Sequence, residues 1–246
     1  MILSNKKTRK SARVLNEKLE QLNYSGIINF GNGHLNTYYP DIINKPEAVA
    51  KAVNKLQALQ IFEENGLTTT LITEDEARTA VLSGFKAVGR KTYHSKGRGM
   101  YMCYTLMGIR RAKRLGASHF LKYIDHAREF RVHVVNGQSI KVSEKILTGT
   151  SQMRRNHRFG AISVYPHDFD HKKTLRKVAK QAVECLGLDF GAVDILYKDG
   201  VFYLLEVNTA MCLTDPQSDT LDRYVKAFTN ENSDTITDTA ITQPLL

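Results

Sequence analysis

The pattern of apolar and polar positions predicts short strands along most of the chain and helices at several places before and between them. Apolar residues recur at helical spacing from Leu175 to Leu186, and Gly187 ends that run. Another helix is predicted between Pro46 and Gly66, and a short one at 11–22. Alternating positions predict strands at 26–32, 67–73, 85–90, 99–105, 119–124, 129–135, 139–146, 191–197 and 201–207. Because strict βαβ alternation is missing, the sequence predicts an α+β fold, and the polar segment 147–166 is predicted to be a functional loop.

Composition narrows the class of protein. Of the 246 residues, 42% are hydrophobic and 24% are charged, which is ordinary for a soluble globular chain. No apolar run approaches the ~20 residues of a membrane span, and the first residues become polar too early for a secretory signal. The three cysteines lie far apart, which argues against a disulfide framework or a structural zinc site. A cytoplasmic location is therefore predicted.

The charge is unevenly distributed. The net charge is +10, and no acidic residue occurs between Glu76 and Asp125, a stretch that is rich in lysine and arginine. Such a field attracts polyanions, for example a nucleoside triphosphate, a nucleic acid or an acidic protein. The alternative is a basic surface that is simply solvated.

The clearest candidate for chemistry is the pair of strands joined at Asp199-Gly200. The two-residue period of a strand places Glu206 and Asn208 on one face, and Asp194 is a lone carboxylate in an apolar strand. A buried carboxylate needs a cation, a metal ion or hydrogen-bond donors. Oxygen ligands of this kind suit Mg²⁺ or Mn²⁺, and an ordinary salt bridge is the alternative.

A shared metal site here sets a geometric condition. A two-residue turn at Asp199-Gly200 would pair Lys198 with Val201, and Asp194 would then point away from Glu206. We therefore predict either a loop of odd length around Gly200 or a compensating β-bulge.

Residues 90–100, RKTYHSKGRGM, form a basic loop with two glycines between predicted strands. Small residues let backbone N–H groups approach phosphate oxygens, and Arg90, Lys96 and Arg98 add positive charge. The loop matches neither the Walker A pattern nor GxGxxG, so an ordinary turn is the alternative.

Two further motifs contain arginine. Glu129 and Arg131 share one face of a predicted strand, where Arg131 can bind a phosphate or form a common salt bridge. The segment 153–158, MRRNHR, suits an oxyanion clamp or a solvated loop. The eight histidines show no HExxH motif and no spacing typical of metal ligands.

In chain order, these motifs resemble the ATP-grasp superfamily, and above all its RimK-type branch of ribosomal-protein glutamate ligases. The segment that leads into the ATP-grasp module is similar to residues 43–67, INKPEAVAKAVNKLQALQIFEENGL. AVGRKTYHSKGRGM resembles the loop that closes over the triphosphate, and FLKYIDHAREFRVHVVNG resembles the adenine hinge followed by the acidic-x-Arg strand. SEKI carries a lysine at the position of a phosphate contact, and RRNHRFGA resembles the loop near the reaction centre. GAVDIL and LLEVNTA resemble the metal-binding hairpin, so the resemblance covers roughly residues 42–215.

The resemblance implies an ATP-grasp fold with a shortened N-terminal region at 1–45, a small subdomain at 46–120, a large subdomain at 121–228 and a polar tail at 229–246. It implies metal ligands at Asp194, Glu206 and Asn208. The catalytic residues that it implies are Arg131, Arg154, Arg155 and Asn156. The ATP-binding residues that it implies are Arg90, Ser95, Lys96, Gly97, Arg98, Gly99, Lys122, Tyr123, Ile124, Asp125, Glu129 and Lys145.

The implied activity is an ATP- and Mg²⁺-dependent carboxylate–amine ligation through an acylphosphate. The expected partners are ATP, an amino acid or other amine, and an acidic protein or nucleic-acid acceptor; many ligases of this kind are homo-oligomers. The chain departs from the family at Arg90, where lysine is usual, at Lys122, where an acid is common, and at Met211-Cys212, which replace Pro-Gly. A non-catalytic nucleotide-binding module is therefore one alternative, and a nucleic-acid-binding protein is another.

Overall fold

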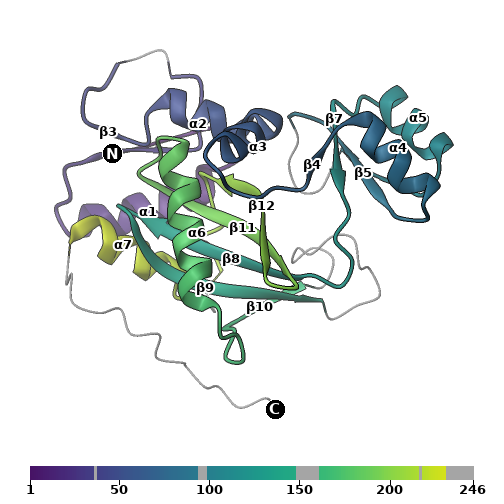
Figure 1. The fold of residues 1–246 in the computed structure, drawn as a ribbon. Helices are drawn as coiled ribbons and strands as arrows, with labels where there is room; N and C mark the ends of the chain where they lie inside the picture. The colour runs from purple at the N-terminus through teal and green to yellow at the C-terminus, as the bar shows by residue number, and fades with distance from the viewer. Residues whose placement is uncertain (36–37, 94–98, 148–160, 216–217, 231–246) are drawn as a thin grey trace.

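The computed structural model describes residues 1–35, 38–93, 99–147, 161–215 and 218–230. Three β-sheets follow one another along the chain, and helices pack against each of them (Figure 1). The mixture of helices with largely antiparallel sheets confirms the α+β prediction. Within the described residues, none of the helices combines the length and the apolar character of a membrane span.

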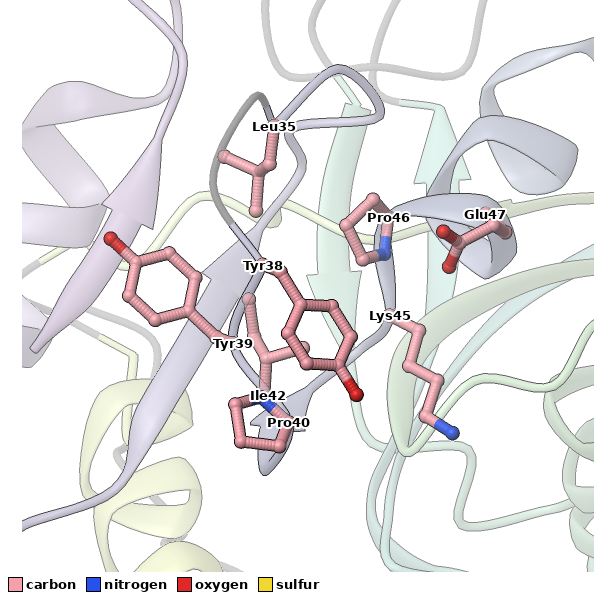
Figure 2. A pocket seen from close by; sticks show the side chains of 8 residues that line it. All are labelled: Leu35, Tyr38, Tyr39, Pro40, Ile42, Lys45, Pro46 and Glu47. Atoms are coloured by element: carbon pink, nitrogen blue, oxygen red, sulfur yellow. The ribbon is translucent and has the colours of Figure 1, made fainter.

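The first sheet is parallel and lies at the N-terminus. It contains β1 (Ile2–Ser4), β2 (Ile27–Phe30) and β3 (Ile42–Ile43), and α1 (Arg9–Gln21) connects β1 to β2. Residues between β2 and the start of the next helix line an open pocket of about 300 Å³ (Figure 2). Its lining residues are Leu35, Tyr38, Tyr39, Pro40, Ile42, Lys45, Pro46 and Glu47.

Two helices occupy the segment where the pattern predicts one. α2 (Pro46–Val53) and α3 (Lys55–Glu64) are separated at Asn54, whose backbone is extended. The Asn54 side chain accepts a hydrogen bond from the backbone N–H of Gln57 at 3.2 Å, so it caps α3. The prediction of a single helix was therefore wrong. The capping bond favours the start of a second helix at Asn54, and the period of the apolar residues does not reveal this break.

The second sheet forms a small unit with two helices on its outer face. Its strands run in the order β4 (Leu71–Ile72), β7 (His119–Lys122), β5 (Ala87–Arg90) and β6 (Met100–Cys103). α4 (Glu74–Leu82) begins with a capping box between Thr73 and Glu76, and α5 (Leu106–Arg114) runs antiparallel to it, with Lys113 bonded to Glu74. The two helices and Phe120 of β7 form a separate small core.

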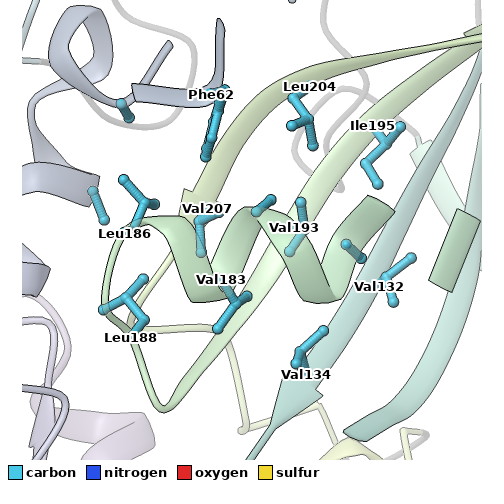
Figure 3. Packing of buried hydrophobic residues seen from close by; sticks show 14 of the residues in the cluster. Phe62, Val132, Val134, Val183, Leu186, Leu188, Val193, Ile195, Leu204 and Val207 are labelled. Carbon is cyan, nitrogen blue, oxygen red and sulfur yellow. The ribbon is translucent and has the colours of Figure 1, made fainter. Parts of the chain in front are cut away.

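The third sheet is the largest and carries the main core. Its strands run in the order β10 (Ala161–Val164), β9 (Gln138–Leu147), β8 (Arg128–Val135), β11 (Phe190–Lys198) and β12 (Val201–Asn208), all antiparallel. α6 (Lys172–Cys185) covers one face, where Val132, Val134 and Val193 of the sheet and Val183 of the helix belong to one buried core (Figure 3). α7 (Thr220–Thr229) packs with α1 and β2 against the other face, near the start of β11.

Part of the segment predicted to be a functional loop is a strand. β10 pairs with the end of β9, with Ile162 opposite Ile146. Both isoleucines are exposed, so this edge strand is too short and too little buried to produce a clear apolar pattern.

Hydrogen bonds of Asn44 and Thr68 join the first half of the chain to the large sheet. Asn44 is completely buried, and its side chain bonds to the backbone of Asp189 and Phe190 where α6 turns into β11. In addition, Leu204 of β12 donates its backbone N–H to the carbonyl of Thr68 at 2.9 Å. These bonds fix α3 and the small sheet relative to the edge of the large sheet.

Candidate active site

A β-bulge in the last hairpin decides which side chains face one another. The turn has two residues, Asp199 and Gly200, both with positive φ, so the prediction of an odd loop was wrong. The alternative prediction, a bulge, is confirmed: Leu205 is skipped in the register, and Asp194 therefore lies directly opposite Glu206.

Asn208 completes this group. It lies opposite Ala192, two residues before Asp194 on the neighbouring strand and therefore on the same face. Its amide Nδ2 lies 3.1 Å from Glu206 Oε1 and 3.4 Å from Asp194 Oδ2. The structure thus brings the three predicted metal ligands together.

Two cations neutralise Asp194. Arg131 lies opposite it on β8, and the guanidinium donates two hydrogen bonds of 2.7 Å, from Nε to Oδ1 and from Nη2 to Oδ2. Lys145 of β9 lies 3.0 Å from Oδ2 and also binds Glu129 Oε1 at 2.5 Å. Glu129, Arg131 and Lys145, all predicted to be site residues, therefore belong to one network with Asp194.

Two further cations reach Glu206 from outside the large sheet. Arg90, at the end of β5, donates from Nη2 to Oε2 at 2.6 Å, and Lys55, at the start of α3, lies 3.3 Å from the same oxygen. Both are almost completely buried, with exposed fractions of 5% for Arg90 and 8% for Lys55. These ion pairs join the small sheet and α3 to the β11–β12 hairpin.

Lys55 was missed by the sequence reading. A signal was present, because Lys55 shares one face of its helix with Ala58, Leu59 and Phe62, which are all buried. A lysine on an otherwise apolar helix face requires an anionic partner, but the sequence does not identify Glu206 as that partner.

Electrostatics keeps both carboxylates ionised. Burial raises the pKa of Glu206, but the charges of Lys55 and Arg90, with those of Lys145 and Arg131, hold it well below its ordinary value. Burial likewise opposes ionisation of Asp194, and Arg131 and Lys145 overcome it and lower the pKa. Both groups are therefore charged at neutral pH.

This set of side chains fits a hard divalent cation. Two ionised carboxylates supply oxygen atoms, and a half-turn of the Asn208 amide would present Oδ1 in place of Nδ2. No cluster of three or more His, Cys, Asp and Glu side chains suited to a metal occurs in the described part of the chain. A mixed carboxylate–amide site at Asp194, Glu206 and Asn208 is therefore the candidate metal centre.

The predicted adenine-hinge residues form a second group. Lys122 ends β7 and donates its backbone N–H to Thr70 at 2.7 Å, while Tyr123 donates to the carbonyl of Lys86 at 3.3 Å. The ammonium of Lys86 lies over the Tyr123 ring and bonds to Asp125 at 3.1 Å. These contacts hold the segment from Lys122 to Asp125, which includes Ile124 and leads from the small sheet to the large sheet, against the small sheet.

The predicted glycine loop is described only at its ends. Gly99 has a positive φ of 77°, and its carbonyl accepts a hydrogen bond from Lys91 N at 3.0 Å, which closes the loop between β5 and β6. Ser95, Lys96, Gly97 and Arg98 lie outside the described residues, as do Arg154, Arg155 and Asn156. Their roles stay predictions.

His133 lies on the same strand face as Arg131, on the side where α7 packs. Its Nδ1 is 3.1 Å from the hydroxyl of Tyr224, and both rings are buried. Burial, with the nearby charges of Arg131 and Lys141, lowers the pKa of His133 to about 3. The imidazole is therefore neutral at physiological pH.

A family model described as the RimK-like ATP-grasp domain matches residues 52–226, which is more than half of the chain and includes the whole charged network. The chain belongs to the RimK-like ATP-grasp family. The resemblance seen in the sequence and the ATP-grasp fold are thereby confirmed. The family is one of ATP-dependent carboxylate–amine ligases.

Individual relatives of this RimK-like chain are distant. A probable alpha-L-glutamate ligase of Parasynechococcus marenigrum (strain WH8102) is 26% identical over 188 residues, which cover 69% of this chain and 38% of that protein. The chain therefore spans well under half the length of this curated relative.

Solved structures share the fold at low identity. The ATP-grasp ligase PsnB, complexed with a minimal precursor, has a TM-score of 0.66 at 13% identity, covering 94% of this chain and 98% of PsnB. The D-alanine–D-alanine ligase of Bacillus anthracis has a TM-score of 0.68 at 13% identity, covering 92% of each chain.

Proposed function

We propose that this chain is an ATP-grasp ligase that uses MgATP to join a carboxylate to an amine. The observation that carries the proposal is the network around Asp194 and Glu206, in which residues from β5, α3, β8, β9, β11 and β12 meet. Four cations, Lys55, Arg90, Arg131 and Lys145, surround three carboxylates, Glu129, Asp194 and Glu206. An excess of buried positive charge suits a polyphosphate.

The nucleotide would lie between the small and the large sheet. In this proposal, Arg90 and Lys55 bind phosphate oxygens from one side, and Lys145 binds them from the other. The hinge residues from Lys122 to Asp125 border the adenine, and the loop containing Ser95–Gly99 covers the triphosphate. Arginine at position 90 presents a planar fork of donors, so it can bind two phosphate oxygens where a lysine binds as a point charge.

Asp194, Glu206 and Asn208 would hold Mg²⁺, which supplies charge neutralisation and alignment of phosphate oxygens when bound. PsnB, a fold relative at 14% identity, has been solved in a complex with a minimal precursor, Mg and ADP. Replacement of Mg²⁺ by Mn²⁺ stays a prediction.

The chemistry proposed is acyl transfer in two steps. A substrate carboxylate oxygen attacks the γ-phosphorus of ATP, so the new P–O bond forms as ADP leaves. The amine nitrogen then attacks the acyl carbon and loses a proton to solvent, and the C–O bond to phosphate breaks as inorganic phosphate leaves. Arg131 stabilises the negative charge that develops in both steps, and Arg154 or Arg155 with Asn156 assists it.

The acceptor is proposed from the nature of the relatives. One is a probable alpha-L-glutamate ligase, and another is bound to a minimal precursor. We therefore infer an amino acid as the amine donor and a peptide or protein carboxylate as the acceptor.

The test is a turnover assay with the purified chain, ATP, Mg²⁺, pooled amino acids and candidate acceptors. We expect phosphate release that depends on a second substrate, and a mass gain equal to one amino acid less water. ATP binding with no phosphate release for any acceptor would instead favour the non-catalytic module.

A further inference from the structure

The outer face of α6 carries a dense group of cations. The helix buries Leu175, Ala179, Ala182 and Val183 against the large sheet, and its opposite side faces solvent (Figure 1). The basic residues on this helix, here called the α6 basic face, are Lys172, Lys173, Arg176, Lys177 and Lys180. The one acidic residue of the helix is Glu184, near the opposite end from Lys172.

The two lysines of the first turn and the Lys173–Lys177 pair do not stabilise the helix. Lys172 and Lys173 lie in the first turn, where the helix macrodipole favours acids, and that turn has no acidic residue. Lys173 and Lys177 are four residues apart on the exposed surface, and such like-charge pairs repel each other. Within the described residues, no acidic side chain lies within salt-bridge distance of either lysine.

Aromatic rings flank the basic face at its start. Tyr165 and His167 contact each other at 4.8 Å between ring centroids, and Lys172 Nζ lies 5.1 Å from the Tyr165 ring. His171, exposed like His167, precedes the helix and contacts Tyr197 at 5.3 Å. Rings beside a row of lysines are typical of surfaces that stack bases and bind phosphates.

This surface is separate from the nucleotide network. α6 packs on the sheet face that carries Phe130, Val132 and Val134, whereas Arg131 on the alternate face binds Asp194. A ligand on α6 therefore need not compete with ATP.

We propose that the α6 basic face binds single-stranded nucleic acid. The lysines contact phosphates, and His167 and His171 stack against bases. An acidic polypeptide would match the lysines equally well, but it has no bases to stack on the rings, so the aromatic group favours a nucleic acid.

The experiment measures fluorescence anisotropy of a labelled 12-nucleotide oligouridine titrated with the full chain at several KCl concentrations. The variant K173Q/K177Q removes two phosphate contacts. Each contact with a single strand contributes about 0.7 to the slope of log Kd against log [KCl], so we expect this slope to fall by about 1.4. At about 0.1 M salt this loss corresponds to a roughly 10- to 30-fold weaker Kd. K6Q/K7Q, which removes the same charge from an exposed pair near the N-terminus, is the matched control and should bind like the unaltered chain.

Two further measurements identify the ligand class and the surface. H167A/H171A should weaken oligouridine binding without changing the slope of log Kd against log [KCl]. Poly-L-glutamate has no bases, so it should bind H167A/H171A and the unaltered chain with the same affinity. Excess MgATP should leave oligouridine bound, and circular dichroism should show each variant to be folded. Equal losses in K173Q/K177Q and K6Q/K7Q, displacement by MgATP, or no effect of H167A/H171A would overturn the proposal.

Discussion

Asp194 and Glu206 face each other across the β11–β12 ladder because Leu205 is left out of the register between them. Without that bulge, the two-residue turn at Asp199-Gly200 would send the two carboxylates to opposite faces of the sheet. The bulge therefore places both carboxylates on the same face of a hairpin that has a two-residue turn. It thereby joins Glu206, with its partners Arg90 and Lys55, to the group that Arg131 and Lys145 form around Asp194.

Neutral amides at these positions should abolish the proposed ligation. We expect Asp194→Asn and Glu206→Gln each to reduce ATP-dependent phosphate release at least about 100-fold, because each removes charge where the reaction needs preorganised electrostatics. Asp199→Asn is the matched control, since Asp199 is an exposed turn carboxylate on the same hairpin. Near-normal turnover by either site variant would exclude the metal assignment.

Lys55 should contribute to binding of the nucleotide. A charged hydrogen bond contributes about 1.5–3 kcal/mol, so we expect Lys55→Gln to raise the KM for ATP about 10- to 150-fold. Lys51→Gln, an exposed lysine on α2, should leave the KM unchanged. Initial rates at varied ATP concentration measure the effect, and an unchanged KM would mean that Lys55 only balances the charge of Glu206.

His133 should make stability depend on pH in the mildly acidic range. Its pKa is lowered to about 3 in the folded chain, against about 6.5 for an unfolded histidine. Between these values only the unfolded state takes up the proton, so the free energy of unfolding should fall as the pH is lowered from about 6.5.

Urea denaturation at several pH values measures this dependence. His133→Gln should flatten the profile, whereas His34→Gln, at an exposed position, should keep it. A profile of the same slope in His133→Gln would assign the pH dependence to other groups.

Asn44 should be essential for stability although it is not part of the charged network. Its Oδ1 accepts from Asp189 N at 2.8 Å and Phe190 N at 3.1 Å, and its Nδ2 donates to Phe190 O at 3.0 Å. Its φ of 60° adds a second constraint.

We expect Asn44→Ala to lower the free energy of unfolding by about 2–4 kcal/mol, because it leaves buried backbone groups unpaired. Asn44→Gly should be somewhat milder, since glycine accepts the positive φ. Asn65→Ala, whose one side-chain bond is exposed, is the control in the same denaturation experiment.

Local patterns in the sequence predicted many of the elements, and these patterns together with the family resemblance predicted the residues of the charged network other than Lys55. Period-two and helical spacing gave α6, β8 and β9, because burial of one face imposes those repeats. The chemistry of the oxygen-bearing trio indicated a metal site before any fold was known. The spacing of Asp194 and Glu206 about the turn also showed that a shared site requires either an odd loop or a β-bulge.

Tertiary structure decided how that condition is met and which cations complete the site. A bulge depends on pairing between two strands, so no one-strand pattern reveals that Leu205 is skipped. Lys55 and Arg90 approach Glu206 from segments 151 and 116 residues away along the chain, by the differences of their residue numbers. Their meeting is set by packing of α3 and the small sheet against the large one, and a sequence period cannot encode contacts between segments so far apart.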